Sequence, residues 1–392
     1  MIHAPGGAGR GWQEGHVIVA PDKFKGSLTA GQVAAHIAAG LRRERPDLPV
    51  VTIPVADGGD GTVEAMVASG FSGLQTAVTG PVGNRVVAAF AMRGDTAVIE
   101  LAEASGLRRL PDRPTPLTAR TASSFGTGEL IRTAVSRGAR RIVLGLGGSA
   151  CTDGGAGMLT ALGARLLDDD GEQLPPGGVA LQRLARIDTS GLMRVQITVA
   201  SDVDNPLLGP RGAAHVYGGQ KGAGSDDIEA LERGLTRFAE IAARDHFVDK
   251  AERPGAGAAG GVGFAALAFL GARTEPGIEI ILRHLEFGDR LAGARLVITG
   301  EGCLDRQTLH GKAPIGVARA AVAAGVPVLA VSGQRLLTRD VLRRIGFQDA
   351  FALTDIEPDP QLCIANADAL LEQLAAQIAG TRLGELPART TN

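Results

Sequence analysis

Short apolar runs, each followed within two residues by Gly, Pro or Asp, place the strongest constraint on how this chain can fold. They are rich in Val, Ile and Leu and lack polar alternation, which is typical of strands buried on both faces of a parallel sheet. Helical periodicity lies between them and is clearest at 29–43 and 226–244. Alternating strands and helices predict an α/β protein. The clearest runs are residues 16–20, 50–55, 141–146, 196–200, 296–299 and 326–331.

Two β-rich pieces, 86–92 and 97–101, depart from this rhythm. Turn residues such as Gly94 join them, which predicts antiparallel hairpins. We therefore expect a second domain to begin near Gly80, inserted into a domain that both ends of the chain build. The length of 392 residues also favours two domains.

Composition excludes several classes of function. The net charge is -2, with no basic tail, which argues against partners such as nucleic acid or a membrane surface. No apolar run approaches the ~18 residues of a membrane span. Residues 1–15 lack an apolar core and are expected to be a disordered extension. Cys151, Cys303 and Cys363 are far apart in the sequence, which predicts a reducing compartment and a cytoplasmic protein.

The loop after the first apolar run carries Asp22, Lys23, Lys25 and Ser27. A helix is expected to open behind Ser27. Ligands of α/β proteins bind at the carboxyl ends of parallel strands, and backbone N–H groups at the next helix start attract anions. Lys25 would act there as a point charge on phosphate or carboxylate. The alternative is a solvated surface lysine.

The second run ends in a loop that contains Asp57, Gly58, Gly59 and Asp60. Its glycines allow the backbone to approach a ligand closely, and Asp57 or Asp60 could hold Mg²⁺. The alternative is a tight turn in which Asp60 or Thr62 caps the following helix.

Glycine, Ser and Thr follow the run 141–146 in an eleven-residue loop, 147–157. Clustered N–H and hydroxyl donors of this kind can cradle phosphate. The segment 123–128 begins another helix with similar chemistry. Either segment could instead be structural, although the loop 147–157 is longer than a turn between a strand and a helix requires.

Carboxylates follow two further runs. Asp202 and Asp204 would face one hard cation if their strand continued; the alternative is an Asx turn at Asn205 before a proline. After the run 296–299, Glu301, Asp305 and Lys312 occur within a dozen residues. Phosphoryl transfer needs a carboxylate that acts as a base or binds a metal, and a nearby cation that binds phosphate. This segment contains both.

Several well-known nucleotide-binding and catalytic motifs are incomplete or absent in this sequence. Gly255, Gly257 and Gly260 satisfy GxGxxG, but no strand precedes them, so a Rossmann nucleotide site is rejected. Ala313 follows Lys312 where a P-loop needs Ser or Thr. The sequence has neither zinc-ligand spacing nor a GxSxG elbow.

Together these motifs resemble the type-1 glycerate kinase family over almost the whole chain, roughly residues 16–379. They occur in the family's order and at similar spacing. Lys23 stands where Ser is common in the family, Cys151 and Thr152 where Thr-Asn is common, and Ser201 where Cys is common. The matching stretches are APDKFKGSL, PVADGGDGT, IELAEASGL, SSFGTGELI, GLGGSACTDGGAGM, SDVDNPLLGP, QKGA, GAGAAGG and ITGEGCLDRQTLHGKAP.

The resemblance implies two α/β domains with the active site in the cleft between them. A flavodoxin-like parallel-sheet domain would comprise 16–78 and 288–392, and a mixed α/β domain, 79–287, would be inserted into it. The implied activity is Mg²⁺-assisted transfer of a phosphoryl group from ATP to D-glycerate, with 2-phosphoglycerate the expected product rather than 3-phosphoglycerate.

Roles for single residues also follow from the resemblance. Lys25 and Lys312 would neutralise phosphate or carboxylate charge, and Asp202 or Glu301 would accept the hydroxyl proton. Asp202 or Asp204, with Asp57, would hold Mg²⁺. The nucleotide would contact Gly58, Gly59, Gly147, Gly148, Ser149, Gly154, Gly155, Gly260 and Gly261, and the substrate Asp22, Lys23, Ser27, Asp305, Gln307 and Thr308.

Three questions stay open at this stage. The motifs fix phosphate chemistry better than they fix the acceptor, so a kinase of another short hydroxy acid is an alternative. A non-catalytic sensor of nucleotides or metabolites on the same fold is a second alternative, although its acidic residues would be expected to be lost. A homodimer is also open.

Overall fold

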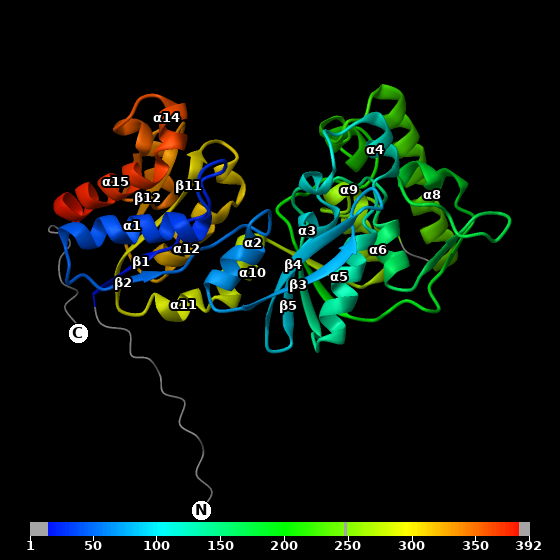
Figure 1. Cartoon of the computed structure of the whole chain (residues 1–392), viewed down its shortest axis with the longest axis horizontal. Coiled ribbons are helices and arrows are strands. Elements are labelled where there is room, and N and C mark those ends of the chain that lie inside the picture. Colours follow the sequence, from blue (N-terminus) through cyan, green and yellow to red (C-terminus); the bar gives the residue numbers. More distant parts are fainter. Residues whose placement is uncertain (1–14, 247–248, 384–392) are drawn as a thin grey trace, which may run out of the picture. The chain divides into compact units, whose positions relative to one another are not determined.

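The computed structural model describes residues 15–246 and 249–383, and these form two compact units. Unit 1 combines Met1–Val55 with Leu282–Asn392, and unit 2 is Ala56–Ile281. Figure 1 follows the chain from unit 1 into unit 2 and back. The expected disordered extension, 1–15, lies outside the described residues except for Gly15. Within the described ranges, no helix combines the length and apolar character needed to cross a lipid bilayer.

Unit 1 is built on a five-stranded sheet whose order is β13-β12-β11-β1-β2. Every neighbouring pair is parallel. Counted along this unit alone, the order is 2-1-3-4-5, the flavodoxin-like arrangement. The predicted fold class is therefore confirmed for this unit. Its strands are β1 (His16–Val19), β2 (Val50–Thr52), β11 (Ala294–Leu304), β12 (Val328–Arg335) and β13 (Asp349–Ala352).

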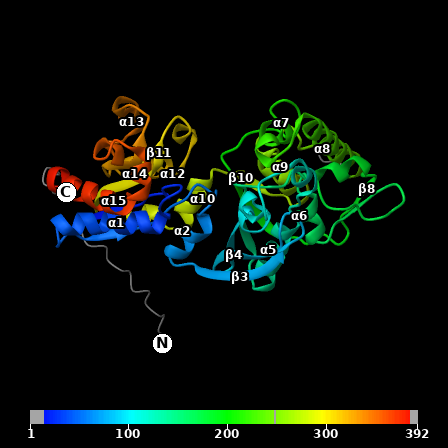
Figure 2. The same cartoon turned by 45° about the horizontal axis from the view of Figure 1, so that its top comes forward.

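Helices α1 and α15 lie side by side in Figures 1 and 2 and share one core with the sheet. Ile37 of α1 and Ile378 of α15 pack with Val17 and Leu296 of the two central strands. Ile18 and Val297, which alternate with these residues, are equally buried, so both faces of the sheet are covered. The helices are α1 (Ala30–Glu44), α11 (Phe287–Arg290), α12 (Ala313–Ala323), α13 (Arg339–Ile345), α14 (Pro360–Ala365) and α15 (Ala367–Arg382), with the 3₁₀ turns η4 (Thr308–His310) and η5 (Leu353–Asp355).

Unit 2 is built on a six-stranded mixed sheet of order β10-β9-β6-β5-β4-β3. β5, β6, β9 and β10 are parallel, while β3 and β4 add an antiparallel edge. The predicted hairpin segments are β4 and β5, which confirms the antiparallel pieces. The strands are β3 (Ser72–Thr79), β4 (Arg85–Arg93), β5 (Thr96–Glu100), β6 (Arg141–Gly145), β9 (Gln196–Ala200) and β10 (Arg273–Glu275), with β7 (Arg165–Leu167) and β8 (Arg186–Asp188) paired separately.

One large apolar cluster unites this sheet with its helices. Phe90 and Leu144 from the strands pack in it together with Ile131 of α5 and Phe238 of α8. The helices are α2 (Thr62–Ala68), α3 (Leu101–Ser105), α4 (Pro116–Thr121), α5 (Phe125–Ser136), α6 (Ala156–Ala161), α7 (Ala213–Tyr217), α8 (Ser225–His246) and α9 (Ala258–Phe269), with α10 (Gly277–His284) at the boundary and the 3₁₀ turns η1 (Leu107–Arg109), η2 (Gly178–Arg183) and η3 (Gly219–Lys221).

Two boundaries differ from the sequence expectation. Residues 56–78 and 282–287 were expected on the other side of the domain boundary. Helix α2 belongs to unit 2 because it packs against β3, β4 and β5. The helix expected at 29–43 is α1, Ala30–Glu44, so this prediction is confirmed with a shift of one residue. Thr29 forms a capping box with Gln32, and each side chain takes a backbone N–H that the helix leaves unpaired.

Candidate active site

In unit 1 the loop that follows β1 runs along the carboxyl-terminal half of the adjacent strand β11. This is the point where the strand order of the sheet reverses, which is where open α/β sheets bind ligands. The Asp22 N–H donates to the carbonyl of Gly300 at 2.8 Å, and the Thr299 hydroxyl donates to the carbonyl of Ala20 at 2.6 Å. The two motifs that carry Lys25 and Glu301 are therefore joined by the backbone.

Glu301 is held from two sides at this point. The Thr308 hydroxyl donates to its Oε1 at 2.7 Å, and the Lys312 ammonium lies 3.3 Å from its Oε2. Glu301 is only 7% exposed. Removal from water raises the pKa of its carboxyl above the ordinary value, and the Thr308 and Lys312 contacts oppose that rise. Such a carboxylate can accept a proton at neutral pH.

Some of the other residues expected to contact the substrate are held by hydrogen bonds within the chain, whereas one is exposed. Thr308 is fully buried; its hydroxyl bonds Glu301 and also accepts the N–H of Asp305. The Asp305 carboxylate accepts the N–H groups of Gln307 and Thr308, which closes the η4 turn. The Gln307 side chain is exposed. Thr308 therefore positions Glu301, whereas Gln307 is open to a ligand.

The loop after β1 presents Lys25 to solvent. Phe24 is buried beneath it and anchors the loop. The Ser27 hydroxyl donates to the Phe24 carbonyl at 3.1 Å, so it stabilises the turn. Asp22 is nearly buried, and its carboxylate accepts the Lys23 N–H at 2.7 Å. Of these predicted residues, Lys25 is the one best placed to meet a mobile anion.

In unit 2 the loop 57–61 lies across the ends of β6 and β9. A side chain on Gly145 would come within 2.3 Å of the Gly58 carbonyl, and one on Gly58 within 2.9 Å of the Ala200 Cβ. A side chain on Gly147 would come within 2.9 Å of the Gly59 Cα. The structure thus brings Gly58 and Gly59 together with Gly147, three of the glycines expected to approach a nucleotide. Gly59, Gly147 and Gly148 are at least partly accessible.

Two of the three expected metal ligands are close neighbours. Loss of water raises the pKa of Asp202 to about 6, helped by the charge of Asp57 and opposed by the N–H of Gly277. Strand β9 ends at Ala200, so Asp202 and Asp204 do not continue one strand face as expected. The charge of Asp204 instead acts on Tyr217, whose pKa rises through burial and this carboxylate.

The donor set suits a partly hydrated cation. No group of three or more acidic, His or Cys side chains that could hold a metal by themselves occurs in the described residues. Mg²⁺ commonly takes one or two carboxylates and completes its shell with water and substrate phosphates. Asp57 and Asp202 fit that pattern as a pair.

Four of the glycines expected to cradle a nucleotide serve packing instead. Gly154, Gly155, Gly260 and Gly261 are all buried. A side chain on Gly261 would come within 2.7 Å of the Gly154 Cα, and one on Gly260 within 2.1 Å of the Cys151 carbonyl. They allow the loop 151–155 to lie directly on the start of α9. The accessible part of the glycine loop is Gly147 and Gly148; Ser149 is only 7% exposed.

Two buried charged residues that the sequence expectations missed, Asp153 and Lys221, fix this loop. The Asp153 carboxylate is fully buried and accepts the N–H groups of Ser124, Gly155 and Gly157 at 2.8, 3.1 and 3.2 Å. The Lys221 ammonium, on a side chain that is 2% exposed, reaches the Cys151 carbonyl. Burial lowers the pKa of Lys221, while the nearby Asp153 charge opposes this shift. The scarcity of lysine was the available clue, since Lys221 lies in a Gly-rich segment.

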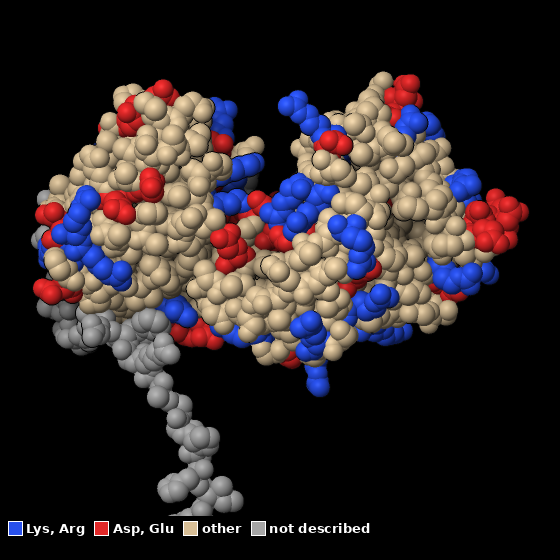
Figure 3. Space-filling view, in the orientation of Figure 1, with Lys and Arg blue, Asp and Glu red and all other residues tan. Residues whose placement is uncertain are grey.

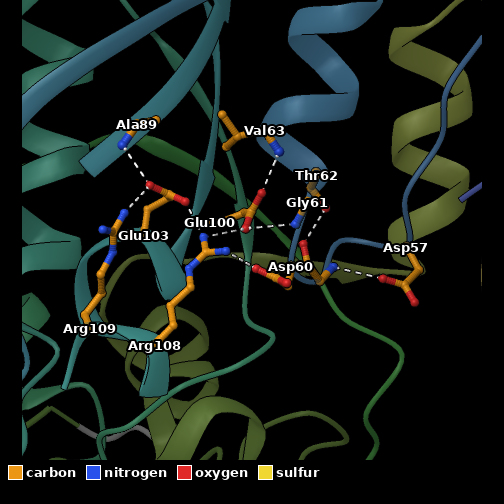
Figure 4. A network of polar contacts seen from close by, with 11 residues as sticks. Asp57, Asp60, Gly61, Thr62, Val63, Ala89, Glu100, Glu103, Arg108 and Arg109 are labelled. Atoms are coloured by element: carbon orange, nitrogen blue, oxygen red, sulfur yellow. Dashed lines mark hydrogen bonds and ion pairs between the residues drawn. The ribbon is translucent and has the colours of Figure 1, made fainter. Parts of the chain in front are cut away.

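A second buried acid holds the loop 57–61 from below. Figure 4 shows Glu100, at the end of β5, pointing toward the start of α2. Its carboxylate accepts the N–H of Val63 at 2.6 Å and that of Gly61 at 3.2 Å. Burial raises the pKa of Glu100 to about 7, while the Val63 N–H and the Arg108 charge oppose the shift. Glu100, which lies on β5, thus accepts N–H groups at the start of α2 that the helix itself leaves unpaired.

Arg108 extends this network toward the solvent. It contacts the carboxylates of Asp60, Glu103 and Glu100, as Figure 4 shows. Glu103 also pairs with Arg109 and accepts a backbone N–H from β4. Asp60 therefore neither caps α2 nor joins the Asp57–Asp202 pair. The N-cap residue of α2 is Gly61, which has no side chain that could accept a helix N–H.

The surface drawn in Figure 3 carries charges of both signs. Figure 3 shows Lys and Arg interspersed with Asp and Glu on the face drawn. A field of one sign, as nucleic acid would require, is not seen on that face.

Comparisons with known proteins converge on one family. The sequence model of the Glycerate kinase family matches residues 17–383. The glycerate kinase of Bacillus subtilis (strain 168) is 44% identical over 373 residues, covering 93% of this chain and 97% of that protein. The glycerate 2-kinase of Escherichia coli (strain K12) is 47% identical over 333 residues, covering 83% and 86%.

The fold comparison agrees with the sequence comparisons. A crystal structure from Salmonella typhimurium LT2, of a protein provisionally named glycerate kinase 2, matches with a TM-score of 0.84 at 43% identity. The match covers 95% of this chain and 99% of that one, so it includes both units.

Proposed function

The chain belongs to the glycerate kinase family and is a phosphotransferase, and on this premise we propose that it transfers the γ-phosphoryl group of ATP to D-glycerate. The observation that carries the proposal is the buried Glu301, which lies in the carboxyl-terminal half of β11 and is held by Thr308 and Lys312. It supplies a proton acceptor and a cation side by side, as phosphoryl transfer to a hydroxyl requires.

The acceptor side of the reaction is assigned to unit 1. Glu301 would accept the proton of the glycerate hydroxyl, since burial weakens its acidity without separating it from Lys312. Lys25 is exposed and would neutralise the glycerate carboxylate or a phosphate oxygen. We favour the 2-hydroxyl as the acceptor because a relative that is 47% identical is named a glycerate 2-kinase.

The donor side is assigned to unit 2. Backbone N–H groups of Gly147 and Gly148 would face the phosphates, because this part of the glycine loop is accessible. The Gly59 N–H instead donates to the Asp57 carboxylate at 3.0 Å. Asp57 and Asp202 would hold Mg²⁺. Bound there with the phosphates, the ion would neutralise the charge of the transferred group.

The proposed roles are divided between the two units. Unit 1 offers a base and cations for the acceptor but lacks the paired Asp57 and Asp202. Unit 2 offers that pair and accessible glycine N–H groups, whereas Glu301 and Lys312 lie in unit 1.

The test is ³¹P NMR of the purified protein with Mg-ATP and D-glycerate, beside a control without glycerate. We expect a glycerate-dependent phosphoester signal with matching ADP, and its coupling pattern distinguishes 2- from 3-phosphoglycerate. ATP consumption that does not depend on glycerate, or no consumption, would contradict the proposed acceptor. A panel of other short hydroxy acids would then identify the acceptor, and its failure would support a non-catalytic sensor.

A further inference from the structure

A cavity of about 380 Å³ in unit 2 has no role in the chemistry assigned above. Its wall combines the turn between β3 and β4, the start of α5, the start of α6 and the segment 173–177. All of these lie inside one compact unit. The cavity therefore exists independently of how the two units are arranged, and its volume is in the range of small-molecule sites.

The lining is apolar with a few neutral polar groups. Phe125, Leu166, Leu174 and Leu181 are among its apolar lining residues. The polar residues of the lining are Thr121, Ser123, Thr160 and Gln173. The three hydroxyl groups donate to other groups of the chain, which leaves the Gln173 amide as the polar group for a ligand. None of the residues that the structure places around the cavity is charged. Such a lining favours a neutral ring with hydrogen-bonding edges and disfavours a phosphate or a carboxylate.

The cavity is structurally continuous with the glycine loop. Ala156 and Gly157 are part of its wall and are the last two residues of the loop 147–157. The buried Asp153 carboxylate binds the Ser124 N–H and the Gly157 N–H, and so fixes both sides of the wall. One carboxylate thus shapes the loop and the cavity together.

The distance across the sheet also suits one extended ligand. The glycine loop follows β6, and the turn at the cavity follows β3, three strands away in the sheet. The ends of β3 and β6 lie at the same edge, because β3 and β5 run in the same direction and β6 is parallel to β5. Three strand spacings amount to roughly 14 Å, comparable with an extended nucleoside triphosphate.

We propose that this cavity binds the adenine ring of ATP, with the triphosphate running from it to Gly147 and Gly148. The inference rests on the proposed function, since it places the base of the nucleotide whose phosphates that proposal assigns to the glycine loops. Phe125 and Leu174 contribute apolar surface from two different segments of the wall, and the exposed Gln173 can meet the edge of the base.

The test is to fill the cavity and to measure nucleotide binding directly. Leu174→Trp adds bulk at the wall, and Phe125→Ala removes a ring. Leu117→Trp, at an exposed position that does not line the cavity, is the matched control. Titration calorimetry gives Kd for ADP and for inorganic tripolyphosphate, and steady-state kinetics give KM for ATP and for D-glycerate. Thermal melting shows which variants fold.

We expect Leu174→Trp and Phe125→Ala each to raise the Kd for ADP by roughly ten- to a hundredfold, the range of a lost base–aromatic contact. KM for ATP should follow, while KM for D-glycerate and the Kd for tripolyphosphate should stay within about twofold of the wild type, because the phosphate-binding end is untouched. If Leu174→Trp does not fold, Phe125→Ala carries the test alone.

Two outcomes would overturn the inference. One is a folded variant that binds ADP as the wild type does. The other is equal weakening of ADP and tripolyphosphate, which would mean that the substitution distorts the glycine loop. Failure of the proposed function looks different: ADP binding would remain sensitive to Leu174→Trp although no glycerate is phosphorylated.

Discussion

The ammonium group of Lys221 lies 2.5 Å from the main-chain carbonyl of Cys151, at the centre of the glycine loop of unit 2. Lysine rarely occupies so buried a position without a function or a partner. Here its Nζ also lies 3.4 Å from the Thr152 hydroxyl. The negative charge of Asp153 favours the charged form of Lys221. The contact therefore fixes a loop whose accessible glycines are assigned to phosphate.

We expect Lys221→Met to lower the free energy of unfolding by about 1–3 kcal/mol, the cost of leaving a buried carbonyl without a donor. Turnover should fall as well, because the loop loses its anchor. Urea unfolding and steady-state kinetics measure the two effects. Lys250→Met removes a lysine that is only half-buried and should change neither. Wild-type stability in Lys221→Met would contradict the anchoring role.

Glu301→Gln tests the assigned base. The amide keeps the size of the side chain and can still accept the hydrogen bond from Thr308, but it cannot take up a proton. We expect kcat to fall by about 10²–10⁴-fold, with KM for ATP little changed. Added Mg²⁺ should not restore the rate. A decrease of less than about tenfold would exclude Glu301 as the base and favour Asp202.

Asparagine substitutions of the acidic residues test the assigned Mg²⁺ ligands. Asp57→Asn and Asp202→Asn should each raise the Mg²⁺ concentration needed for half-maximal activity, because each removes one charge from the pair. Asp204→Asn serves as the matched control, since its charge acts on Tyr217. Activity measured against Mg²⁺ at fixed ATP reads out the effect. The same Mg²⁺ requirement in all three variants would refute the pair.

Much of the architecture followed from sequence patterns, but its closest contacts did not. Buried apolar runs predicted the parallel strands because burial on both faces removes polar alternation. The neighbours of β1 could not be predicted this way, since pairing joins residues such as Val17 and Leu296 across most of the chain. Composition also cannot separate Gly147, which is partly accessible, from Gly154, which packs against Phe238. Thr308 was expected to meet the substrate, but it lies beneath Glu301.

Gly261→Ala tests whether the buried glycines serve packing. The new methyl group would lie 2.7 Å from the Gly154 Cα, in a backbone with φ of 93°. Gly171→Ala has a similar φ of 80° but open space around it, so it reports the backbone strain alone. We expect about 1 kcal/mol of destabilisation for Gly171→Ala and clearly more, about 3 kcal/mol, for Gly261→Ala. Equal losses in urea unfolding would argue against close packing.

The Glu100 carboxyl predicts how the stability of the protein depends on pH. Its pKa is raised from 4.5 to about 7 in the folded state, so between these values the folded protein binds more protons at this site than the unfolded chain does. The stabilisation is therefore complete below about pH 4.5 and is lost as the pH rises through 7, by about 3 kcal/mol in total. Gln mimics the protonated acid and does not titrate. We expect the stability of the wild type to fall relative to Glu100→Gln between pH 4.5 and 7 and to run parallel to it above pH 8. Curves of urea unfolding against pH that stay parallel throughout would show that Arg108 and the Gly61 and Val63 N–H groups keep Glu100 ionised.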